Sequence, residues 1–489
     1  AGGLNWPTSR SALPCSTRAR GREFTNLERI FVMQYHFCGV GGSGMSALAQ
    51  VLVHRGHNVQ GSDRTFDRDP DSELARKLQA LGIKLVPQDG SGLHSAIDEV
   101  VTSTAVEASI PDLERARELD LPLRHRSMIL ADLLNAANGI AVGGTSGKTT
   151  VTGMIGTILQ QVHKKPTVIN GGIMLNALGN GAIGNVLCGD PDMLVAEADE
   201  SDGTIAHYWP RVSVVTNIGL DHKPMDELIE LFSRFVSRAG VAVLNSDCSH
   251  CNTLLAMSPR CRTFGFRADA QLRALDVDCR AEGSTFTVNG FPVMLAVPGR
   301  HNVANALAAI AAVHAIGVPL RDAACAISEF RGIQRRMQII GTAHEITVID
   351  DFAHNPDKIA AALATLHLLA PRLRVWFQPH GFGPTRFLMA GIVRAFRLGL
   401  RQEDELHVAP IYYAGGTATR DVSSHELADG VRSTNLKAVA YDDREASLAG
   451  LIANAGPRDC VAILGARDPQ LTETAVGVLA AIDARGPAR

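Results

Sequence analysis

The chain has 489 residues and a formal net charge of -3; 46% of its residues are hydrophobic and 20% are charged. At about 150 residues per domain, this length predicts about three domains, each able to bury its own core. A net charge this near zero gives no bulk reason to expect nucleic acid or an anionic membrane as a partner. No apolar stretch reaches the roughly 20 residues that a membrane-spanning helix requires. We therefore expect a soluble protein without a membrane partner, of undefined oligomeric state.

Nine cysteines are scattered through a chain that is large enough to fold without disulfides. This usage is typical of a reducing compartment and favours the cytoplasm. Cys248 and Cys251 have the C-x2-C spacing of a zinc site and Cys261 follows, but no second close pair completes the set, so zinc is not favoured. Residues 1–28 lack the apolar core of a secretory signal. We expect a disordered extension there, with a transit-like leader as the alternative.

A Gly-rich turn begins the ordered part of the chain. The pattern over 35–60 is strand, turn, helix and strand, the order of a nucleotide-binding βαβ unit. Gly39, Gly41 and Gly44 satisfy G-x-G-x-x-G, which lets the backbone approach a pyrophosphate at a helix N-terminus. Asp63 follows about 20 residues later, where a carboxylate can bind a sugar hydroxyl. The motif alone leaves NAD, another nucleotide and a purely structural turn open.

A second nucleotide pattern, G-T-S-G-K-T-T at 144–150, follows an expected strand and opens an expected helix. Backbone N–H groups of such a loop can cradle phosphates, while Lys148 can neutralise their oxygens and the Thr149 hydroxyl can hold Mg²⁺. The full Walker spacing would need Gly where Val142 stands. Packing gives no reason for a lysine at this place, so the loop predicts phosphate binding.

Acidic and imidazole side chains follow the next two expected strands, near 194–196 and 212–218. The first strand ends in E-A-D-E-S-D, which starts at Glu197, and the second is followed by His222. Strand C-termini are where α/β sheets bind ligands, and these groups can complete Mg²⁺ shells around ATP. A solvated acidic turn is the alternative for the first cluster.

Two amides lie one turn apart near the start of an expected buried helix over 299–314. Asn302 and Asn305 have i, i+3 spacing, which places them on one face. An Asn at this end of a helix is often only a cap. The alternative is that the pair recognises a base or a ribose.

A third segment begins near residue 332. It contains Arg336, then Asp351 and His354 after one expected strand, and His380 after another. Polar residues at successive strand ends predict another parallel sheet whose ligand edge carries them.

These motifs occur together, and in this order, in the Mur ligases, the ATP-dependent amide-bond-forming enzymes of bacterial peptidoglycan precursor synthesis. The resemblance covers the chain from about residue 29 to the end and rests on G-T-S-G-K-T-T, E-A-D-E-S-D, T-N-I-G-L-D-H, P-G-R-H-N-V-A-N-A, R-R-M-Q and D-D-F-A-H-N-P. Within the family, F-C-G-V-G-G-S-G-M-S, the G-S-D turn and H-R-S-M-I-L resemble the branch that acts on UDP-N-acetylmuramate. The first Gly-rich loop would then bind UDP rather than NAD.

The resemblance implies an α/β fold of three domains. These are a Rossmann-like UDP-sugar domain (29–136), a central P-loop domain for ATP (137–331) and a Rossmann-like domain that binds the amine and closes on ATP (332–489). It also implies that the lactyl carboxylate of UDP-N-acetylmuramate attacks the γ-phosphate of ATP, and that L-alanine or a related amine displaces phosphate from the acyl phosphate. Alternatives are a ligase that attaches a ready-made peptide, a catalytically altered paralogue and an NAD-dependent dehydrogenase.

The resemblance further implies a role for each matching residue. The residues expected to act in catalysis are Lys148, Glu197, His222, Arg336 and His354. Those expected to contact ATP are Gly144, Thr145, Ser146, Gly147, Lys148, Thr149, Thr150, Asn302, Asn305, Arg336 and Asp351. Those expected to hold Mg²⁺ are Thr149, Glu197 and His222. Those expected to contact the UDP-sugar are Gly39, Gly41, Gly42, Ser43, Gly44, Met45, Ser46, Asp63 and His125. The amine substrate is expected near His380 and Arg386.

The departures from the family pattern fall mainly at the amine end. Where the family branch usually has H-R-Y-x-R-T, this chain has H-G-F-G-P-T-R over 380–386, so one arginine is missing and the other is displaced. Gly416 stands where Glu is usual, and Ser146 stands where His is usual. Because arginine is the natural clamp for a carboxylate, the amine is the least determined substrate.

Overall fold

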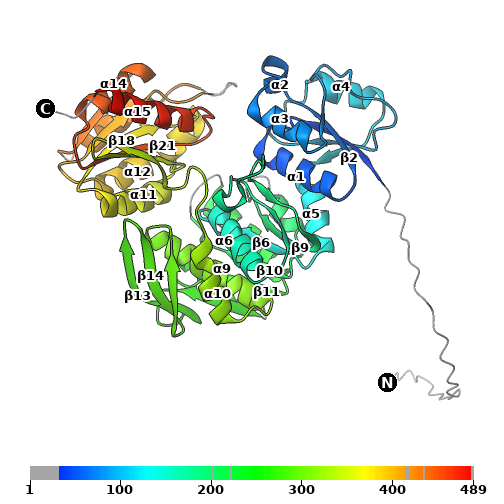
Figure 1. Ribbon diagram of the computed structural model, residues 1–489, viewed down its shortest axis with the longest axis horizontal. Helices are drawn as coiled ribbons and strands as arrows, with labels where there is room; N and C mark the ends of the chain where they lie inside the picture. The colour runs from blue at the N-terminus through cyan, green and yellow to red at the C-terminus, as the bar shows by residue number, and fades with distance from the viewer. Residues whose placement is uncertain are drawn as a thin grey trace, which may run out of the picture. The chain divides into compact units, whose positions relative to one another are not determined.

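Three sheets follow one another along the chain (Figure 1). The computed structural model describes residues 32–200, 203–219, 223–258, 260–413, 419–432 and 435–485. The three sheets fall inside the ranges 29–136, 137–331 and 332–489 that the sequence suggested as domains, and the mixed α/β class is confirmed. The expected extension at 1–28 lies outside the described residues. Within the described part of the chain, no helix is both long and apolar enough to span a bilayer.

The first sheet has five parallel strands in the order β3-β2-β1-β4-β5. Its strands are β1 (Gln34–Cys38), β2 (Asn58–Ser62), β3 (Lys84–Leu85), β4 (Glu99–Thr102) and β5 (Leu123–His125). Its helices are α1 (Ser43–His54), α2 (Arg64–Arg68), α3 (Glu73–Ala80), α4 (Pro111–Glu118) and α5 (Arg126–Ala136). β2 lies on one side of β1 and β4 lies on the other, so the strand order changes direction at β1. The Gly-rich turn after β1 therefore lies at the switch point where such sheets bind ligands.

The second sheet has ten strands in the order β15-β14-β13-β12-β11-β10-β6-β9-β7-β8. Its strands are β6 (Ile140–Gly143), β7 (Pro166–Ile169), β8 (Val186–Leu187), β9 (Asp190–Glu197), β10 (Val212–Val215), β11 (Val241–Asn245), β12 (Cys261–Gly265), β13 (Leu272–Arg280), β14 (Gly283–Val288) and β15 (Phe291–Leu295). Its helices are α6 (Lys148–Gln161), α7 (Met225–Ser237), α8 (Ser249–Asn252), α9 (Arg300–Ala315) and α10 (Leu320–Ala326), with a 3-10 turn η4 (Ile327–Glu329). The antiparallel β13-β14-β15 meander at one edge was not predicted.

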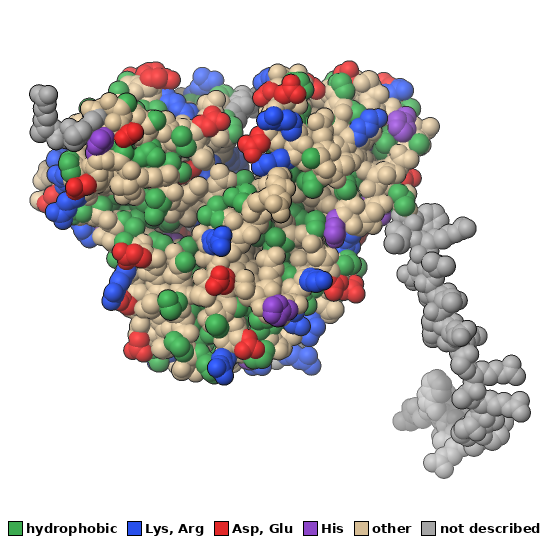
Figure 2. All heavy atoms as spheres, viewed as in Figure 1, with side chains coloured by type: hydrophobic (Ala, Val, Ile, Leu, Met, Phe, Trp, Pro, Cys, Tyr) green, Lys and Arg blue, Asp and Glu red, His purple; other side chains and the backbone are tan. Residues whose placement is uncertain are grey.

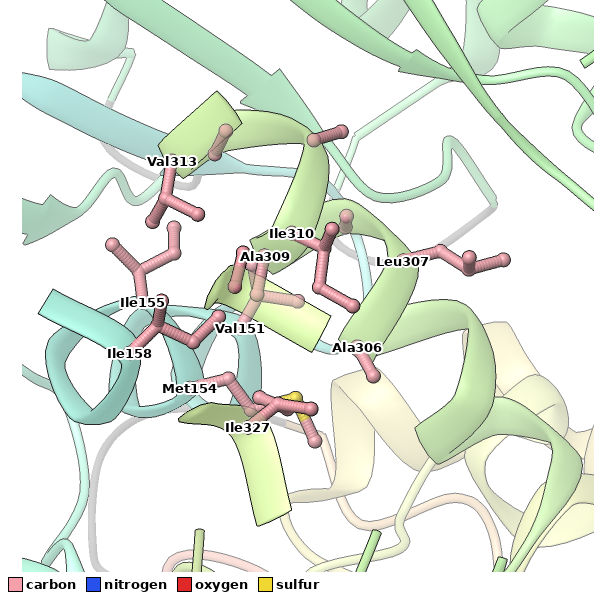
Figure 3. Close-up of a cluster of buried hydrophobic side chains, with 14 of the residues drawn as sticks. Val151, Met154, Ile155, Ile158, Ala306, Leu307, Ala309, Ile310, Val313 and Ile327 are labelled. Carbon is pink, nitrogen blue, oxygen red and sulfur yellow. The ribbon is translucent and has the colours of Figure 1, made fainter. Parts of the chain in front are cut away.

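The central strands alternate between two buried faces, as the period of two in a strand requires. Ile140 and Val142 of β6 pack with α6 and α9, whereas Ala141 packs on the opposite face with α5 and α7. Figure 3 shows the first of these cores, in which side chains of α6, α9 and η4 meet. Its labelled members are Val151, Met154, Ile155, Ile158, Ala306, Leu307, Ala309, Ile310, Val313 and Ile327. This packing fixes the first turns of α6 and α9, which carry the predicted phosphate and amide groups.

The third sheet has six strands in the order β16-β17-β21-β18-β19-β20. Its strands are β16 (Gln338–Ala343), β17 (Ile346–Asp351), β18 (Arg372–Gln378), β19 (Glu405–Val408), β20 (Lys437–Ala440) and β21 (Asp459–Gly465). Its helices are α11 (Pro356–Leu369), α12 (Phe382–Gly399), α13 (Ser424–Arg432), α14 (Arg444–Asn454) and α15 (Leu471–Arg485). The predicted sheet is parallel except at its edge, where β16 pairs with β17 in the antiparallel sense.

Helices cover both faces of this third sheet. In Figure 1, α11 and α12 lie on one side of β18 and β21, and α14 and α15 lie on the other. Val375 and Phe377 of β18 accordingly pack with α11 and α12, and Trp376 between them packs with α14 and α15. Acidic and basic side chains are interspersed over the face shown in Figure 2, in keeping with the small net charge.

Candidate active site

The phosphate loop lies between the end of β6 and the start of α6. Gly147 is the N-cap of α6 and has a φ of +90°, a left-handed conformation that glycine adopts at little cost. A Cβ at Gly147 would lie 2.5 Å from Oδ1 of Asn305. Glycine is therefore required here both by the turn and by the close approach of α9, which brings Asn305 to the loop.

The end of β10 holds the loop in place. The Ser146 N–H donates to Oδ1 of Asn217 at 3.0 Å, and the Ser146 carbonyl accepts from Oγ1 of Thr216 at 2.6 Å and from the Asn217 amide at 3.0 Å. The Thr145 hydroxyl donates to the carbonyl of Gly219 at 3.1 Å. These bonds fix the peptide plane before Gly147, so the shape of the loop is set before a ligand arrives.

Lys148 begins α6, and its ammonium group is held by two oxygens. Nζ donates to the Gly144 carbonyl at 2.7 Å and to Oε2 of Glu200 at 2.6 Å. Burial opposes the charge on Lys148, but the carboxylates of Glu200, Glu197 and Asp199 outweigh it and raise the pKa of the lysine above its ordinary value. Burial raises the pKa of Glu200, and Lys148 partly offsets that shift. The lysine therefore stays charged at neutral pH.

Thr149 and Glu197 form a second polar pair beside the lysine. Oγ1 of Thr149 donates to Oε1 of Glu197 at 3.2 Å, and the other carboxylate oxygen accepts from the N–H of Gly171 at 2.9 Å. A hydroxyl and a carboxylate at the C-terminal edge of a sheet are the hard oxygen ligands that Mg²⁺ prefers. His222, the third predicted metal ligand, lies outside the described residues.

A cavity of about 330 Å³ adjoins the loop. The predicted residues that line it are Ser146, Gly147, Thr149, Thr150, Asn302, Asn305, Arg336 and Asp351. The amide of Asn305 donates to Oδ1 of Asn302 at 3.3 Å, and Asn302 in turn donates to the carbonyl of Pro298 at 2.7 Å. The structure thus brings together the loop, both amides and two groups from the third segment, which the sequence could only propose separately.

Arg336 and Asp351 form the polar wall opposite the loop. Burial lowers the pKa of Arg336 and raises that of Asp351, and each opposes the shift of the other through its charge. Asp351 accepts from the N–H groups of Met337 at 2.7 Å and Ala353 at 2.8 Å, which hold its carboxylate in one orientation. The guanidinium of Arg336 lies 4.7 Å from the ring centre of Phe352. The pair can bind a phosphate and a pair of hydroxyls.

Two histidines near this wall are kept neutral. Burial and Arg336 lower the pKa of His301, which lines the cavity, to about 4. Burial, Lys358 and His380 hold the pKa of His354 well below its ordinary value. Nδ1 of His354 lies 2.8 Å from the Phe352 carbonyl, so this nitrogen carries the proton and Nε2 faces Nζ of Lys358 at 3.4 Å.

The first Gly-rich loop lines a separate cavity of about 450 Å³. The predicted residues in this lining are Gly39, Gly41, Gly42, Met45 and Asp63. Oδ2 of Asp63 accepts from the Gly41 N–H at 3.0 Å, while Oδ1 caps α2 by accepting from the Thr65 N–H at 2.8 Å. Asp63 therefore shapes the loop itself as well as facing the cavity.

Four further residues predicted to contact the UDP-sugar lie outside that lining. The amide of Asn185, immediately before β8, donates to the Ser43 carbonyl at 3.0 Å and to Oγ of Ser46 at 3.1 Å. A Cβ at Gly44 would lie 3.0 Å from the guanidinium of Arg126. His125 is the N-cap of α5. These residues hold the start of α1 against its neighbours.

The two residues predicted at the amine end have different surroundings in the structure. His380 is buried, and its ring centre lies 5.1 Å from that of His354. Arg386, on α12, is exposed; it forms an ion pair with Asp421 and donates to the carbonyl of Thr419 at 3.0 Å. The displaced arginine is thus engaged on the surface in this structure, whereas His380 joins the His354 group.

Several site residues were not assigned from the sequence. Asn217 supports the loop, Glu200 holds Lys148, and His301, Asn245 and Lys358 line the main cavity. Asn217 and Glu200 were within recognised motifs, but their roles depend on contacts between segments that are far apart in the chain. Position beside those motifs was the only available signal.

The chain belongs to the Mur ligase family. The Mur ligase middle domain matches residues 142–313, the Mur ligase glutamate ligase domain matches residues 335–467, and the Mur ligase family catalytic domain matches residues 34–138. The resemblance inferred from the motifs is therefore confirmed, and the chain is a ligase, as predicted.

Two curated relatives are UDP-N-acetylmuramate–L-alanine ligases. That of Acidithiobacillus ferrooxidans is 37% identical over 431 residues, covering 83% of this chain and 89% of the relative. That of Nitratidesulfovibrio vulgaris is 37% identical over 451 residues, covering 89% and 96%. The crystal structure of the UDP-N-acetylmuramate-alanine ligase of Thermotoga maritima aligns with a TM-score of 0.73 at 28% identity, covering 92% and 98%. A murein peptide ligase of Psychrobacter arcticus shares the fold, with a TM-score of 0.67 at 23% identity.

Proposed function

We propose that this ligase joins L-alanine to the lactyl carboxylate of UDP-N-acetylmuramate at the expense of ATP. The observation that carries the proposal is the single cavity that the phosphate loop, the amides of α9 and the Arg336–Asp351 wall line together. The names of the curated relatives support the choice of the two other substrates. The products would be the amide, ADP and inorganic phosphate.

The residues of the main cavity fit ATP. Oγ of Ser146 is buried and has no hydrogen-bond partner in the part of the chain that the structure describes. The first N–H groups of α6 also lack partners within their helix, as at every helix start. An unpaired hydroxyl and free N–H groups in the lining are what a polyphosphate requires, and Lys148 in the same loop supplies positive charge. Asp351 is then placed for the ribose hydroxyls, and Arg336 for a phosphate.

Thr149 and Glu197 would hold Mg²⁺, and His222 is proposed as a further ligand by its motif position alone. When bound, the ion would neutralise charge that develops on the transferred phosphoryl group. The fit rests on the hydroxyl and carboxylate oxygens, which already lie 3.2 Å apart.

The chain's own residues supply positioning and charge. Lys148 is held in place by Gly144 and Glu200, and its charge favours a phosphoryl group that gains negative charge during transfer. His354 stays neutral and adds no repulsion to the incoming amine, so we assign it a supporting polar role beside the reacting carbonyl. No covalent bond between protein and substrate is required, because the carboxylate itself attacks and the amine displaces phosphate.

We infer that the first cavity holds the UDP part of the sugar nucleotide. Its supports are the glycines after β1, which leave room for a pyrophosphate, and the Asp63 carboxylate. A competition experiment tests this assignment: UDP should displace a fluorescent UDP analogue, and NADH should not. The cytoplasmic location and the three domain boundaries stay predictions.

The decisive assay follows phosphate release with Mg-ATP and UDP-N-acetylmuramate across L-alanine, glycine, L-serine and the L-Ala-γ-D-Glu-diaminopimelate tripeptide, and records product mass. A mass gain of one alanine residue supports the proposal. Activity with the tripeptide alone would replace it with peptide recycling. Nucleotide binding without release for any amine would show that the changes at 380–386 have ended or redirected catalysis. Omission of the amine controls for simple ATP hydrolysis.

A further inference from the structure

Two cysteines, Cys248 and Cys251, lie beside Ile218, near the strand end that supports the phosphate loop. Cys248 is the N-cap of α8 and is half-buried, and Cys251 lies in the first turn of this helix with no exposed surface. The Cys251 thiol donates a hydrogen bond to the Cys248 sulfur. In the described part of the chain, the one group of three side chains near enough to share a metal is His36, Cys38 and Asp112, so this pair has no third metal ligand.

The surroundings of Cys248 stabilise a thiolate. Its sulfur lies 3.4 Å from the N–H of Ile218, which donates to it, and it also accepts from the N–H groups of His250 and Cys251. The Cys251 thiol, together with these N–H donors, outweighs the effect of burial and lowers the pKa of Cys248 to about 5. Cys261 has its sulfur 3.5 Å from the carbonyls of Leu255 and Ser258, and burial raises its pKa. The Cys248 sulfur also lies 3.7 Å from the Ile218 carbonyl, so the two cysteines differ in the N–H donors that only Cys248 has.

We propose that Cys248 and Cys251 form a reactive dithiol that small organic disulfides oxidise, and that the resulting disulfide weakens nucleotide binding at the phosphate loop. The spacing supports the bond, because residues at the N-cap and the third position of a helix present their side chains on the same side. The hydrogen bond between the two thiol groups agrees with this placement.

The chemistry balances without a metal. The Cys248 thiolate attacks one sulfur of a disulfide RSSR, which releases RS⁻ and leaves a Cys248–SR mixed disulfide. In the reduced state, the hydrogen bond and the charge of Cys248 help to hold the pKa of Cys251 far above its ordinary value. Capping Cys248 removes these two causes and leaves burial as the remaining one, so Cys251 can release its proton to solvent more easily and attack Cys248. The products are the Cys248–Cys251 disulfide and a second RS⁻; the protein has lost two electrons and RSSR has gained them.

A short chain of contacts joins the pair to the phosphate loop. A disulfide removes the charged acceptor of the Ile218 N–H. The preceding residue, Asn217, binds both the N–H and the carbonyl of Ser146 in the loop. On the other side, the amide of Asn245, at the end of β11, donates to the carbonyl of Thr216 at 2.8 Å. Oxidation therefore acts on the strand end that sets the shape of the loop.

The first test measures the reaction itself and does not depend on the proposed function. The native protein is treated with oxidised glutathione, and the mass of the intact chain and of its peptides is recorded. We expect loss of two hydrogens at Cys248 and Cys251 and no retained glutathione. Cys251→Ala should stop at a glutathione adduct on Cys248, and Cys248→Ser should leave Cys251 unmodified. A wild-type protein that keeps the adduct, or that reacts first at Cys261, overturns the proposal.

The second test measures the dissociation constant of Mg-ATP by calorimetry before and after oxidation. We expect a rise of about tenfold, the size of one hydrogen bond to a charged acceptor, and full recovery with dithiothreitol. Cys261→Ser is the matched control and should respond as the wild type does. This coupling rests on the proposed ATP site: absence of binding by the reduced protein contradicts that function, whereas equal affinities of the reduced and oxidised proteins contradict the coupling.

Discussion

Two Gly-rich loops in this chain have the same local architecture and different surroundings. Each follows a central parallel strand and precedes a helix, and each contains glycines with left-handed or closely packed backbone. At the first loop, the Gly41 N–H is already taken by Asp63. At the second, Lys148 adds a charge that Glu200 holds and Ser146 has an unpaired hydroxyl among the described contacts.

The comparison shows that the glycines leave room for a ligand beside the backbone, and that the neighbouring charged side chains determine which ligand binds. The Asp63 carboxylate at the first loop suits the ribose hydroxyls of a nucleotide. The half-buried Lys148 of the second loop adds a positive charge that favours phosphates. The four predictions below test this difference, starting with the largest expected effect.

Lys148→Ala should lower kcat by about 1,000-fold, because one preorganised charged donor to the transferred group is lost. Steady-state phosphate release measures it. The variant also leaves Glu200 buried without its partner, which we expect to cost about 3 kcal/mol of unfolding free energy. The double variant Lys148→Ala/Glu200→Gln should regain most of that stability and none of the activity. Near-normal phosphate release from either protein would contradict the phosphate-loop assignment.

Gly147→Ala should destabilise the protein by about 3 kcal/mol and weaken ATP binding, because a Cβ would be strained at a φ of +90° and would meet Asn305. Gly56→Ala is the matched control: its φ is +87°, but a Cβ there has nothing within 4 Å. We expect about 1 kcal/mol for the control, from backbone strain alone. Denaturant unfolding measures both, and equal losses would show that the contact with α9 is unimportant.

Asp63→Ala should raise the KM for the UDP-sugar about tenfold and leave the Mg-ATP affinity unchanged, because it removes an acceptor from the first loop alone. It also removes a helix cap, so Asp443→Ala, which uncaps α14 in the same way, serves as the control. Separate titrations of the two substrates distinguish the loops. A shift in ATP affinity with Asp63→Ala would contradict the separation.

The smallest expected effect concerns His301, which lines the cavity beside the second loop. This residue should make the free energy of unfolding depend on pH. Its folded pKa of about 4 lies below the unfolded value near 6.5, so the unfolded chain binds more protons between these values. This contribution to stability is complete above about pH 6.5 and is lost as the pH falls toward 4. His301→Gln should reduce the slope of unfolding free energy by up to about 1.4 kcal/mol per pH unit in that window. An unchanged slope would refute the assignment.

The main strands and helices could be predicted because their signals are local. The helix expected over 299–314 is observed as α9 (Arg300–Ala315), and the strand expected before His380 is observed as β18 (Arg372–Gln378). The β13-β14-β15 meander was missed, since its short alternating strands, with several exposed positions, give a weak pattern. The antiparallel pairing of β16 was missed because pairing direction depends on the neighbour and not on the strand itself.

Site residues that belong to a sequence motif could be predicted. Site residues whose role depends on a contact with a distant part of the chain could not. Lys148 and Thr149 follow from one loop, whereas the assignment of Glu200 to Lys148 and of Asn217 to Ser146 required the strand order of the second sheet. Arg386 shows the converse, since its expected role near the amine came from the family pattern and the structure pairs it with Asp421 on the surface.

The sequence by itself determined the α/β class, the order of the elements, the two Gly-rich loops and the family. These depend on the period of apolar residues and on residue types at fixed short spacings. Only the tertiary structure decided which carboxylate holds Lys148, which residues fix the shape of the phosphate loop, and that Cys248 lies against Ile218 beside that loop. These three contacts join residues 30 or more positions apart in the chain, and their energies depend on burial and distance, which no local pattern contains.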